Sequence, residues 1–337
     1  MDVISPSATL IGTLVGQAWV ESLSIQLTAT DTGEPIEAVS VTTNISGQFQ
    51  LTGITPGTYD IFIDGEQTLP ILLENIEIVE GDNIYPIDPP PVKGDIDDNH
   101  VIDTDDVSIL AIFMNQDKDF NPAADLNKSG AVEIADFALL QKNFLQRWPP
   151  VARAANRGIR SLATQQLTAD VAFEDDVIHA RAGHIMSIPV YIDPSGGEVS
   201  GVTTHFEYNP AELEVVDITL TSHMPQVFTN RVDAEEGRIL VTGGNLFELQ
   251  KERFLFMSLT VRLLEGVEET TITPLTDQFP NTNVVGPAGG ILNNAQSVTV
   301  KPAKTVFLPL IGDGFTQEGY ESLTETLSQL FLPIVTQ

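Results

Sequence analysis

Two stretches of the chain carry oxygen-bearing side chains at the spacing of a calcium-binding loop. Counted from Asp95 and from Asp125, each places such a side chain at positions 1, 3, 5, 9 and 12. The predicted side-chain ligands are Asp95, Asp97, Asn99, Asp103 and Asp106 in the first loop and Asp125, Asn127, Ser129, Glu133 and Asp136 in the second. Ca²⁺ takes roughly six to eight oxygen ligands, and position 7, here Val101 and Ala131, supplies a backbone carbonyl. We therefore expect two calcium ions.

The two loops differ at position 6, where a calcium loop requires a positive φ. Gly130 suits this position in the second loop, whereas His100 occupies it in the first at a cost of roughly 1 kcal/mol or more. The first loop offers four carboxylates at its ligand positions and the second offers three. Charge favours the first loop and geometry favours the second, so their relative affinity stays open.

Each loop leads into a segment with an apolar stripe at helical spacing, which predicts helices over about 104–115 and 134–146. The stripes are Ile109, Leu110 and Phe113 in the first segment and Phe137, Leu140 and Phe144 in the second. No helix is expected before the first loop, because the proline-rich residues 86–92 predict a stiff, extended linker.

This duplicated loop-then-helix pattern, with Asp at position 12, resembles the type I dockerin family over about 94–146. The resemblance implies calcium-dependent folding and docking onto a cohesin domain through the two helices. It also implies recognition pairs at loop positions 10 and 11, here Thr104 with Asp105 and Ile134 with Ala135, which differ from each other. Two plainer interpretations stay open: acidic loops that bind no metal, and calcium with a purely structural role.

Short strands separated by turns are expected before this module. Phe49 and Leu51, then Tyr59, Ile61 and Ile63, alternate around a Pro-Gly turn, as in a half-buried strand pair. The pattern resembles the carboxypeptidase regulatory-like domain, a prealbumin-type β-sandwich, which implies a spacer or adhesive module.

A second all-β region is expected after the module. Alternation of Leu255, Met257, Leu259, Val261 and Leu263 predicts a central strand, and many short strands predict a sandwich or jelly roll. The order of the segments 188–190, 206–210, 213–216 and 256–261 resembles the cohesin family. That resemblance implies a non-catalytic receptor for dockerins, and related sandwiches bind carbohydrate.

The predicted fold is mainly β and multidomain, with two β-sandwich or jelly-roll domains flanking a small helical calcium module. The predicted parts are a sandwich at 7–92, the calcium module at 93–148, a linker at 149–168, a cohesin-like sandwich at 169–303 and a tail at 304–337. The tail repeats an apolar hexamer at 306–311 and 330–335, which is suited to strand addition at a sheet edge.

Composition excludes several classes of function. A net charge of −31 argues against nucleic-acid binding, and the absence of cysteine excludes disulfides and thiol chemistry. No run of apolar residues is long enough to span a membrane. The acidic balance fits an extracellular or cell-surface setting, although the start at Met1 and Asp2 lacks the basic residues of a signal peptide.

An enzyme is not expected. The five histidines are scattered, neither Gly-x-Ser-x-Gly nor His-Glu-x-x-His occurs, and the carboxylates fall on the calcium loops and strand ends.

The expected function is therefore that of a non-catalytic extracellular scaffold that assembles by calcium-dependent docking. Its expected partners are cohesin or dockerin domains of other chains or of its own copies. A head-to-tail contact between identical chains gives rings or filaments, and the tail could add a strand to a neighbour. The alternative is a carbohydrate-binding adhesin or an accessory subunit of a polysaccharide-degrading complex, with polysaccharide as the partner.

Overall fold

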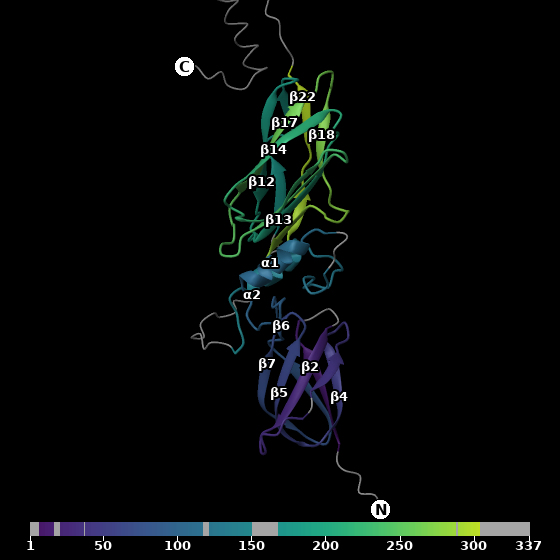
Figure 1. Cartoon of the computed structure of the whole chain (residues 1–337). Coiled ribbons are helices and arrows are strands. Elements are labelled where there is room, and N and C mark those ends of the chain that lie inside the picture. The colour runs from purple at the N-terminus through teal and green to yellow at the C-terminus, as the bar shows by residue number, and fades with distance from the viewer. Residues whose placement is uncertain are drawn as a thin grey trace, which may run out of the picture. The chain divides into compact units, whose positions relative to one another are not determined.

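The computed structural model describes residues 7–16, 21–36, 38–116, 121–149, 168–287 and 289–303 (Figure 1). The chain divides into two compact units, Met1–Pro302 and Ala303–Gln337, and the described residues other than Ala303 belong to the first. The predicted tail at 304–337 and residues 150–167 of the predicted linker therefore lie outside the described residues. The described part is mainly β, as predicted.

The N-terminal region is built from two sheets whose inner faces share one apolar core. One sheet has the order β4 (Gln48–Ile54), β1 (Ala8–Leu14) and β8 (Gly81–Ile87). The other has the order β3 (Val39–Thr42), β2 (Ser22–Ala29), β5 (Gly57–Gly65) and β7 (Ile71–Ile78). The predicted alternating residues Phe49, Leu51, Tyr59, Ile61 and Ile63 are all buried in this core. Their period-two pattern is the reason these segments form strands with one face inward.

The segment that joins this region to the predicted calcium module contains β-structure at both of its ends. Pro86 and Ile87 still pair with β1, so the prediction of an extended linker over the whole of 86–92 is wrong at its start. A short ladder of β6 (Thr68–Leu69) with β9 (Val92–Lys93) follows. The Lys93 ammonium lies 2.5 Å from a carboxylate oxygen of Glu21, and both side chains are buried.

Two helices follow the predicted loops. They are α1 (Thr104–Phe113) and α2 (Ile134–Asn143), each two or three residues shorter than its apolar stripe predicts. Asp103 and Glu133 are the N-cap residues, and in each case the aspartate three residues later accepts a hydrogen bond from the backbone N–H of the cap residue. Leu110, Phe137 and Leu140 are fully buried between the helices and their surroundings.

The C-terminal region is a second two-sheet sandwich. The first sheet has the order β14 (Leu213–Leu220), β17 (Phe254–Leu263), β12 (Ile185–Asp193), β10 (Ala169–Phe173) and β21 (Leu292–Ala295). The second has the order β11 (Val177–Ala180), β22 (Val298–Pro302), β18 (Thr270–Pro274), β13 (Gly201–Glu207), β16 (Arg238–Gly244) and β15 (Gln226–Asp233). In this second sheet β13 also pairs with β19 (Asn283–Gly286), which pairs with β20 (Gly289–Gly290).

The predicted central strand is β17, which lies between β14 and β12. One detail of its prediction is wrong: Leu255 is only half-buried, whereas Phe254 and Phe256 are buried. The cause is a register shift against β12, where Tyr191 pairs with Leu255 but Val190 pairs with Met257. An extra residue in one strand moves the following side chains to the opposite face.

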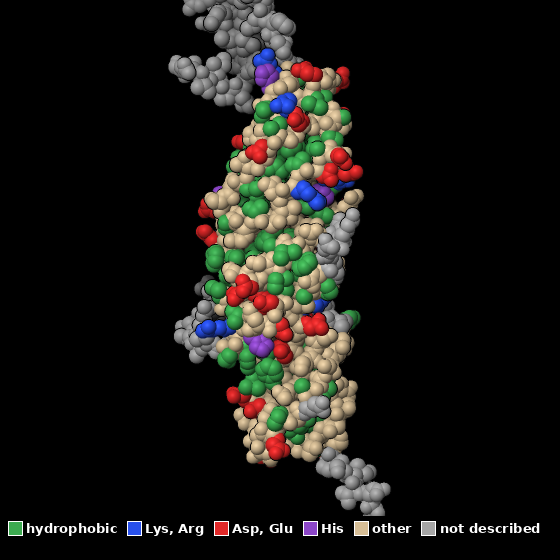
Figure 2. All heavy atoms as spheres, viewed as in Figure 1, with side chains coloured by type: hydrophobic (Ala, Val, Ile, Leu, Met, Phe, Trp, Pro, Cys, Tyr) green, Lys and Arg blue, Asp and Glu red, His purple; other side chains and the backbone are tan. Residues whose placement is uncertain are grey.

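Figure 2 shows acidic side chains scattered along the visible face and fewer basic ones, in keeping with the net charge of −31. Among the described residues, no helix is long and apolar enough to cross a bilayer.

Candidate calcium module and docking surface

The first loop folds around two of its own aspartates. The Asp95 carboxylate accepts hydrogen bonds from the backbone N–H groups of Asn99 at 3.0 Å and His100 at 2.9 Å. Asp106 accepts from Ile96 at 2.6 Å and from Asp103 at 2.8 Å, which joins the start of the loop to the start of α1. Carboxylate oxygens of Asp95, Asp97 and Asp106 lie within 4.8 Å of one another.

The second loop repeats this pattern thirty residues later. Asp125 accepts from Ser129 at 3.0 Å and Gly130 at 2.9 Å, and Asp136 accepts from Asn127 at 3.0 Å and Glu133 at 2.8 Å. In both loops positions 5 and 6 donate to position 1, and positions 3 and 9 donate to position 12, since Asp97 also donates to Asp106 at 3.3 Å. The sequence duplication is therefore also a duplication of local structure.

The predicted ligands divide by depth in the same way in both loops. At positions 1 and 12 Asp95, Asp106, Asp125 and Asp136 are buried. The other predicted ligands lie nearer the surface: Asp97, Asn99 and Ser129 are exposed, whereas Val101, Asp103, Asn127, Ala131 and Glu133 are half-buried.

Burial of these acids makes their charged forms costly without a cation. Desolvation, together with neighbouring carboxylates, raises the pKa of Asp95 to about 6 and that of Asp136 to about 7, against partial relief from the backbone N–H donors. Burial likewise raises the pKa of Asp106 and Glu133. A divalent cation would remove this penalty, and the donors present (carboxylate, amide, hydroxyl and carbonyl oxygens) suit Ca²⁺.

Position 6 has the left-handed backbone expected of it in both loops, with φ of 65° at His100 and 91° at Gly130. Position 4 shares this conformation, with φ of 60° at Asp98 and 58° at Lys128, which spacing alone did not predict. Neither residue at position 4 is a glycine, so nothing in the sequence indicated a positive φ there.

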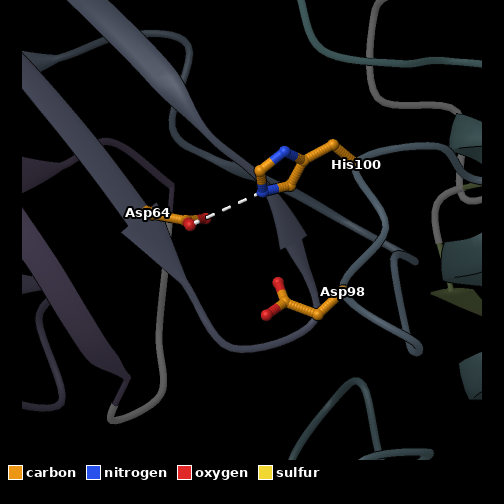
Figure 3. A group of neighbouring side chains, drawn as sticks. All are labelled: Asp64, Asp98 and His100. Atoms are coloured by element: carbon orange, nitrogen blue, oxygen red, sulfur yellow. Dashed lines mark ion pairs between the residues drawn. The ribbon is translucent and has the colours of Figure 1, made fainter.

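His100 also faces a residue that the sequence did not connect with the loop. Its Nε2 lies 3.8 Å from a carboxylate oxygen of Asp64, at the end of β5, and Asp98 joins the group (Figure 3). Burial and the charge of Asp98 raise the pKa of Asp64, whereas His100 lowers it. No local pattern links Asp64 to residues more than thirty positions away.

The helix α2 packs on the C-terminal sandwich, where it contacts β13, β16 and β19. Along β13 and β16 the side chains of Val202, Phe206, Ile239 and Val241 point into the sandwich core. The alternate positions, which include Gly201, Thr203, Thr242 and Gly244, therefore face outward. We call the outer face of β13, β15, β16 and β19 the docking face.

Two glycines of the docking face lie directly beneath α2. A Cβ atom on Gly201 would lie 2.7 Å from the Cδ1 atom of Ile134, and a Cβ on Gly244 would overlap the Phe137 ring. Phe137 also packs against Phe228 of β15, with ring centroids 4.9 Å apart. Leu246 and Val285 belong to the same buried cluster as Phe137 and Leu140. The module and the docking face thus share one apolar core.

Polar contacts surround this core. The Asn115 side-chain amide donates to the Thr242 hydroxyl at 2.7 Å, and Thr242 in turn lies 3.1 Å from the Thr203 hydroxyl. Gln141 donates to the Leu246 carbonyl at 3.4 Å. At the rim the rings of Phe144 and Phe247 meet edge to face, 5.8 Å apart.

The four predicted recognition residues are placed differently by the two helices. Ile134 is buried beside Gly201 and Ala135 is half-buried, whereas Thr104 and Asp105 are exposed. Sequence reasoning missed Gly201, Gly244 and Asn115. Glycines at strand ends were the available signal, because a strand glycine often marks a close approach by another segment.

Comparison with known proteins gives a partial likeness. No family model and no curated protein matches the sequence. Among solved structures, the chain is similar to CaCohA2 from Clostridium acetobutylicum, with 12% identity, 40% of this chain and 90% of that chain covered, and a TM-score of 0.35. It is also similar to a non-cellulosomal cohesin from Archaeoglobus fulgidus, with 14% identity, 41% and 92% covered, and a TM-score of 0.32.

A chain of the Coh-OlpC-Doc435 complex from Clostridium thermocellum, described as a type I cohesin–dockerin complex, matches with 17% identity, 40% and 94% covered, and a TM-score of 0.33. Solved cohesins are thus among the structures that resemble part of this chain, at low identity and low TM-score. The function has to be inferred from the residues of this chain.

Proposed function

We propose that this protein is a non-catalytic scaffold of the extracellular space or cell surface, in which two calcium ions shape a helical module that docks onto a β-sandwich. The ions would be held by the loops at 95–106 and 125–136. The observation that carries the proposal is the fit of α2 on the docking face, with Ile134 and Phe137 seated over Gly201 and Gly244.

Calcium binding and docking are coupled because the predicted calcium ligands and the residues that contact the docking face are close neighbours in the sequence. Ile134 lies between Glu133 and Asp136, which are positions 9 and 12 of the second loop. Asp136 accepts hydrogen bonds from Asn127 and Glu133, positions 3 and 9 of that loop, and is itself in the first turn of α2. An ion bound by these residues would fix the start of α2 and so the direction in which Ile134 and Phe137 point.

Loss of the ion should have the opposite effect. Several acids would then share small, partly desolvated volumes, and their repulsion would oppose the folded loop. Metal binding in such loops is coupled to folding, since the ligands come together only in the folded state. The docking surface of the module is therefore expected to exist only in calcium.

Hydrogen exchange of the full chain, in calcium and in excess chelator, tests the proposal. We expect calcium to protect the amides of α2 and to raise the helical circular dichroism signal. Asp125→Ala should abolish the response of α2. Asp82→Ala is the matched control, because it removes an exposed acid of β8 that lies outside both loops. Equal protection of α2 with calcium and with chelator would rule the proposal out.

A further inference from the structure

The position of α2 identifies the partner of the docking face. We infer that this partner is the calcium module of the same chain, and that the face is thereby closed to modules on other molecules. The inference rests on the proposed function and specifies its partner.

The first argument is the shape of the docking face. Neither Gly201 nor Gly244 has a positive φ, so the backbone does not require glycine at either position. Space does require it, because a Cβ at either position would press into Ile134 or Phe137. The docking face therefore lacks side chains at the two positions where Ile134 and Phe137 of the module lie against it.

The second argument is the polar contact beside these glycines. Thr242 and Thr203 face outward, yet both are buried, and the Asn115 amide reaches Thr242 from the end of α1. Asn115 is held by a left-handed backbone, with φ of 57°, and its N–H donates to the Val132 carbonyl of the second loop at 2.9 Å. Buried hydroxyls need such partners, because an unmade hydrogen bond costs about 1–3 kcal/mol. Asn115 of the module supplies a hydrogen-bond donor to the buried Thr242 hydroxyl of the docking face.

The third argument is the covalent connection. Residues 150–167 join the module directly to the sandwich, so the two surfaces are tethered. A tether whose length suits the span gives an effective concentration on the order of millimolar, so a free module at micromolar concentration is at a disadvantage of about a thousandfold. The head-to-tail assembly expected from the sequence would use the same two helices and a sheet face of the same sandwich. Closure within one chain therefore opposes it.

Cross-linking distinguishes closure within a chain from docking between chains. The chain has no cysteine, so Phe144→Cys with Phe247→Cys places a single thiol pair across the rim of the interface. We expect a short bismaleimide, in calcium, to link the two thiols within one monomer, with a yield independent of protein concentration. Chelator should lower that yield by about tenfold or more, equivalent to about 1.4 kcal/mol.

Each other outcome has one meaning. A ladder of linked dimers and trimers, or a heterodimer when the two single-cysteine chains are mixed, would show docking between chains and overturn the inference while leaving the proposed function intact. No calcium-dependent link of either kind would count against the proposed function itself.

A second variant keeps the inference testable if the cysteines disturb the rim. Gly244→Leu should abolish protection of α2 from hydrogen exchange while the sandwich still unfolds at its usual temperature, because the new side chain faces out of the sandwich core. Gly290→Ala is the matched control, since a Cβ at Gly290 meets its nearest atom at an ordinary 3.6 Å. Unchanged protection of α2 in Gly244→Leu would overturn the inference.

Discussion

The two copies of the calcium motif are alike in their loops and unlike in their helices. Asp95 and Asp125 accept the same pair of backbone hydrogen bonds, as do Asp106 and Asp136 at the helix starts. Along α1 only Asp106 and Leu110 are buried, whereas α2 buries residues along its whole length. The residues predicted to bind calcium thus form the same local structure in both copies, whereas α2 buries far more of its length than α1 does.

The difference lies in a few side chains at equivalent positions. Thr104 and Asp105 of α1 are replaced in α2 by Ile134 and Ala135, and Val107 is replaced by Phe137. Apolar residues without charge at these positions allow α2 to lie on the docking face at no desolvation cost, whereas Asp105 would have to lose its hydration. We therefore expect the loop to determine whether each helix forms, and the side chains of the helix's first turn to determine what the helix contacts.

Removing one ligand from each loop gives the largest expected contrast. Asp125→Ala should remove one calcium ion and release α2 from the sandwich, whereas Asp95→Ala should remove the other ion and leave α2 protected. Both changes together should abolish the calcium-induced rise in helical signal. Calorimetry for stoichiometry and hydrogen exchange for each helix would check this. If Asp95→Ala frees α2 as fully as Asp125→Ala does, the two copies are not independent and the contrast fails.

Truncating the equivalent residues Phe137 and Val107 should give the next largest difference. Phe137 is fully buried, so Phe137→Ala should lower the free energy of unfolding in calcium by about 3–5 kcal/mol. Val107 is half-buried, so Val107→Ala should cost only about 1 kcal/mol. Chemical denaturation measures both. Similar losses for the two variants would show that α1 is as deeply packed as α2.

Exchanging the recognition pairs tests whether those residues cause the difference. Ile134→Thr with Ala135→Asp should weaken docking by about 2 kcal/mol, because it removes apolar burial and brings a carboxylate to the interface. The reverse exchange in α1, Thr104→Ile with Asp105→Ala, should change stability by no more than about 0.5 kcal/mol, since both side chains are exposed. The yield of the intramolecular cross-link reports the first effect and thermal unfolding the second. If the cross-link yield is unchanged in Ile134→Thr with Ala135→Asp, other residues of α2 must account for its docking.

The smallest expected effect is at position 6 of the loops. His100→Gly should stabilise the calcium-loaded first loop by about 1 kcal/mol, because glycine adopts the φ of 65° without strain. Loss of the partly exposed contact with Asp64 should offset little of this gain. Gly130→Ala should cost the second loop about 1 kcal/mol through the backbone alone, since a Cβ there meets nothing within 4 Å. Calcium titrations of both variants measure the effects, and a lower affinity in His100→Gly would show that His100 contributes more than strain.

Local patterns in the sequence were enough to predict the elements of the site. The spacing of oxygen-bearing residues predicted both loops, and the apolar stripes predicted both helices, because each signal spans fewer than about four turns of chain. The positive φ at His100 and Gly130 follows from the same spacing. Alternation also predicted β17 as a central strand, although the bulge beside Leu255 has no signature in hydrophobicity.

Contacts between distant segments were not predictable in this way. Asp64 lies near His100, and Gly244 near Phe137, only because the strands and helices assemble as they do. The sequence showed that Thr104 with Asp105 differs from Ile134 with Ala135, but it did not show which pair is engaged. That depends on complementarity with the docking face, which is a property of two surfaces rather than of either one.

The exposure of the outer side of α1 has a consequence for valence. Thr104, Asp105, Ser108 and Ile112 are exposed on this helix, and Ile112 retains 64% of its accessible surface. Of the two helices of the module, a chain whose docking face is filled from within leaves α1 exposed for a partner, and so resembles a monofunctional monomer in a step-growth polymerisation. Mixed with scaffolds that carry several docking elements, such a chain would end an assembly rather than extend it, and its abundance would set the length of the assembly.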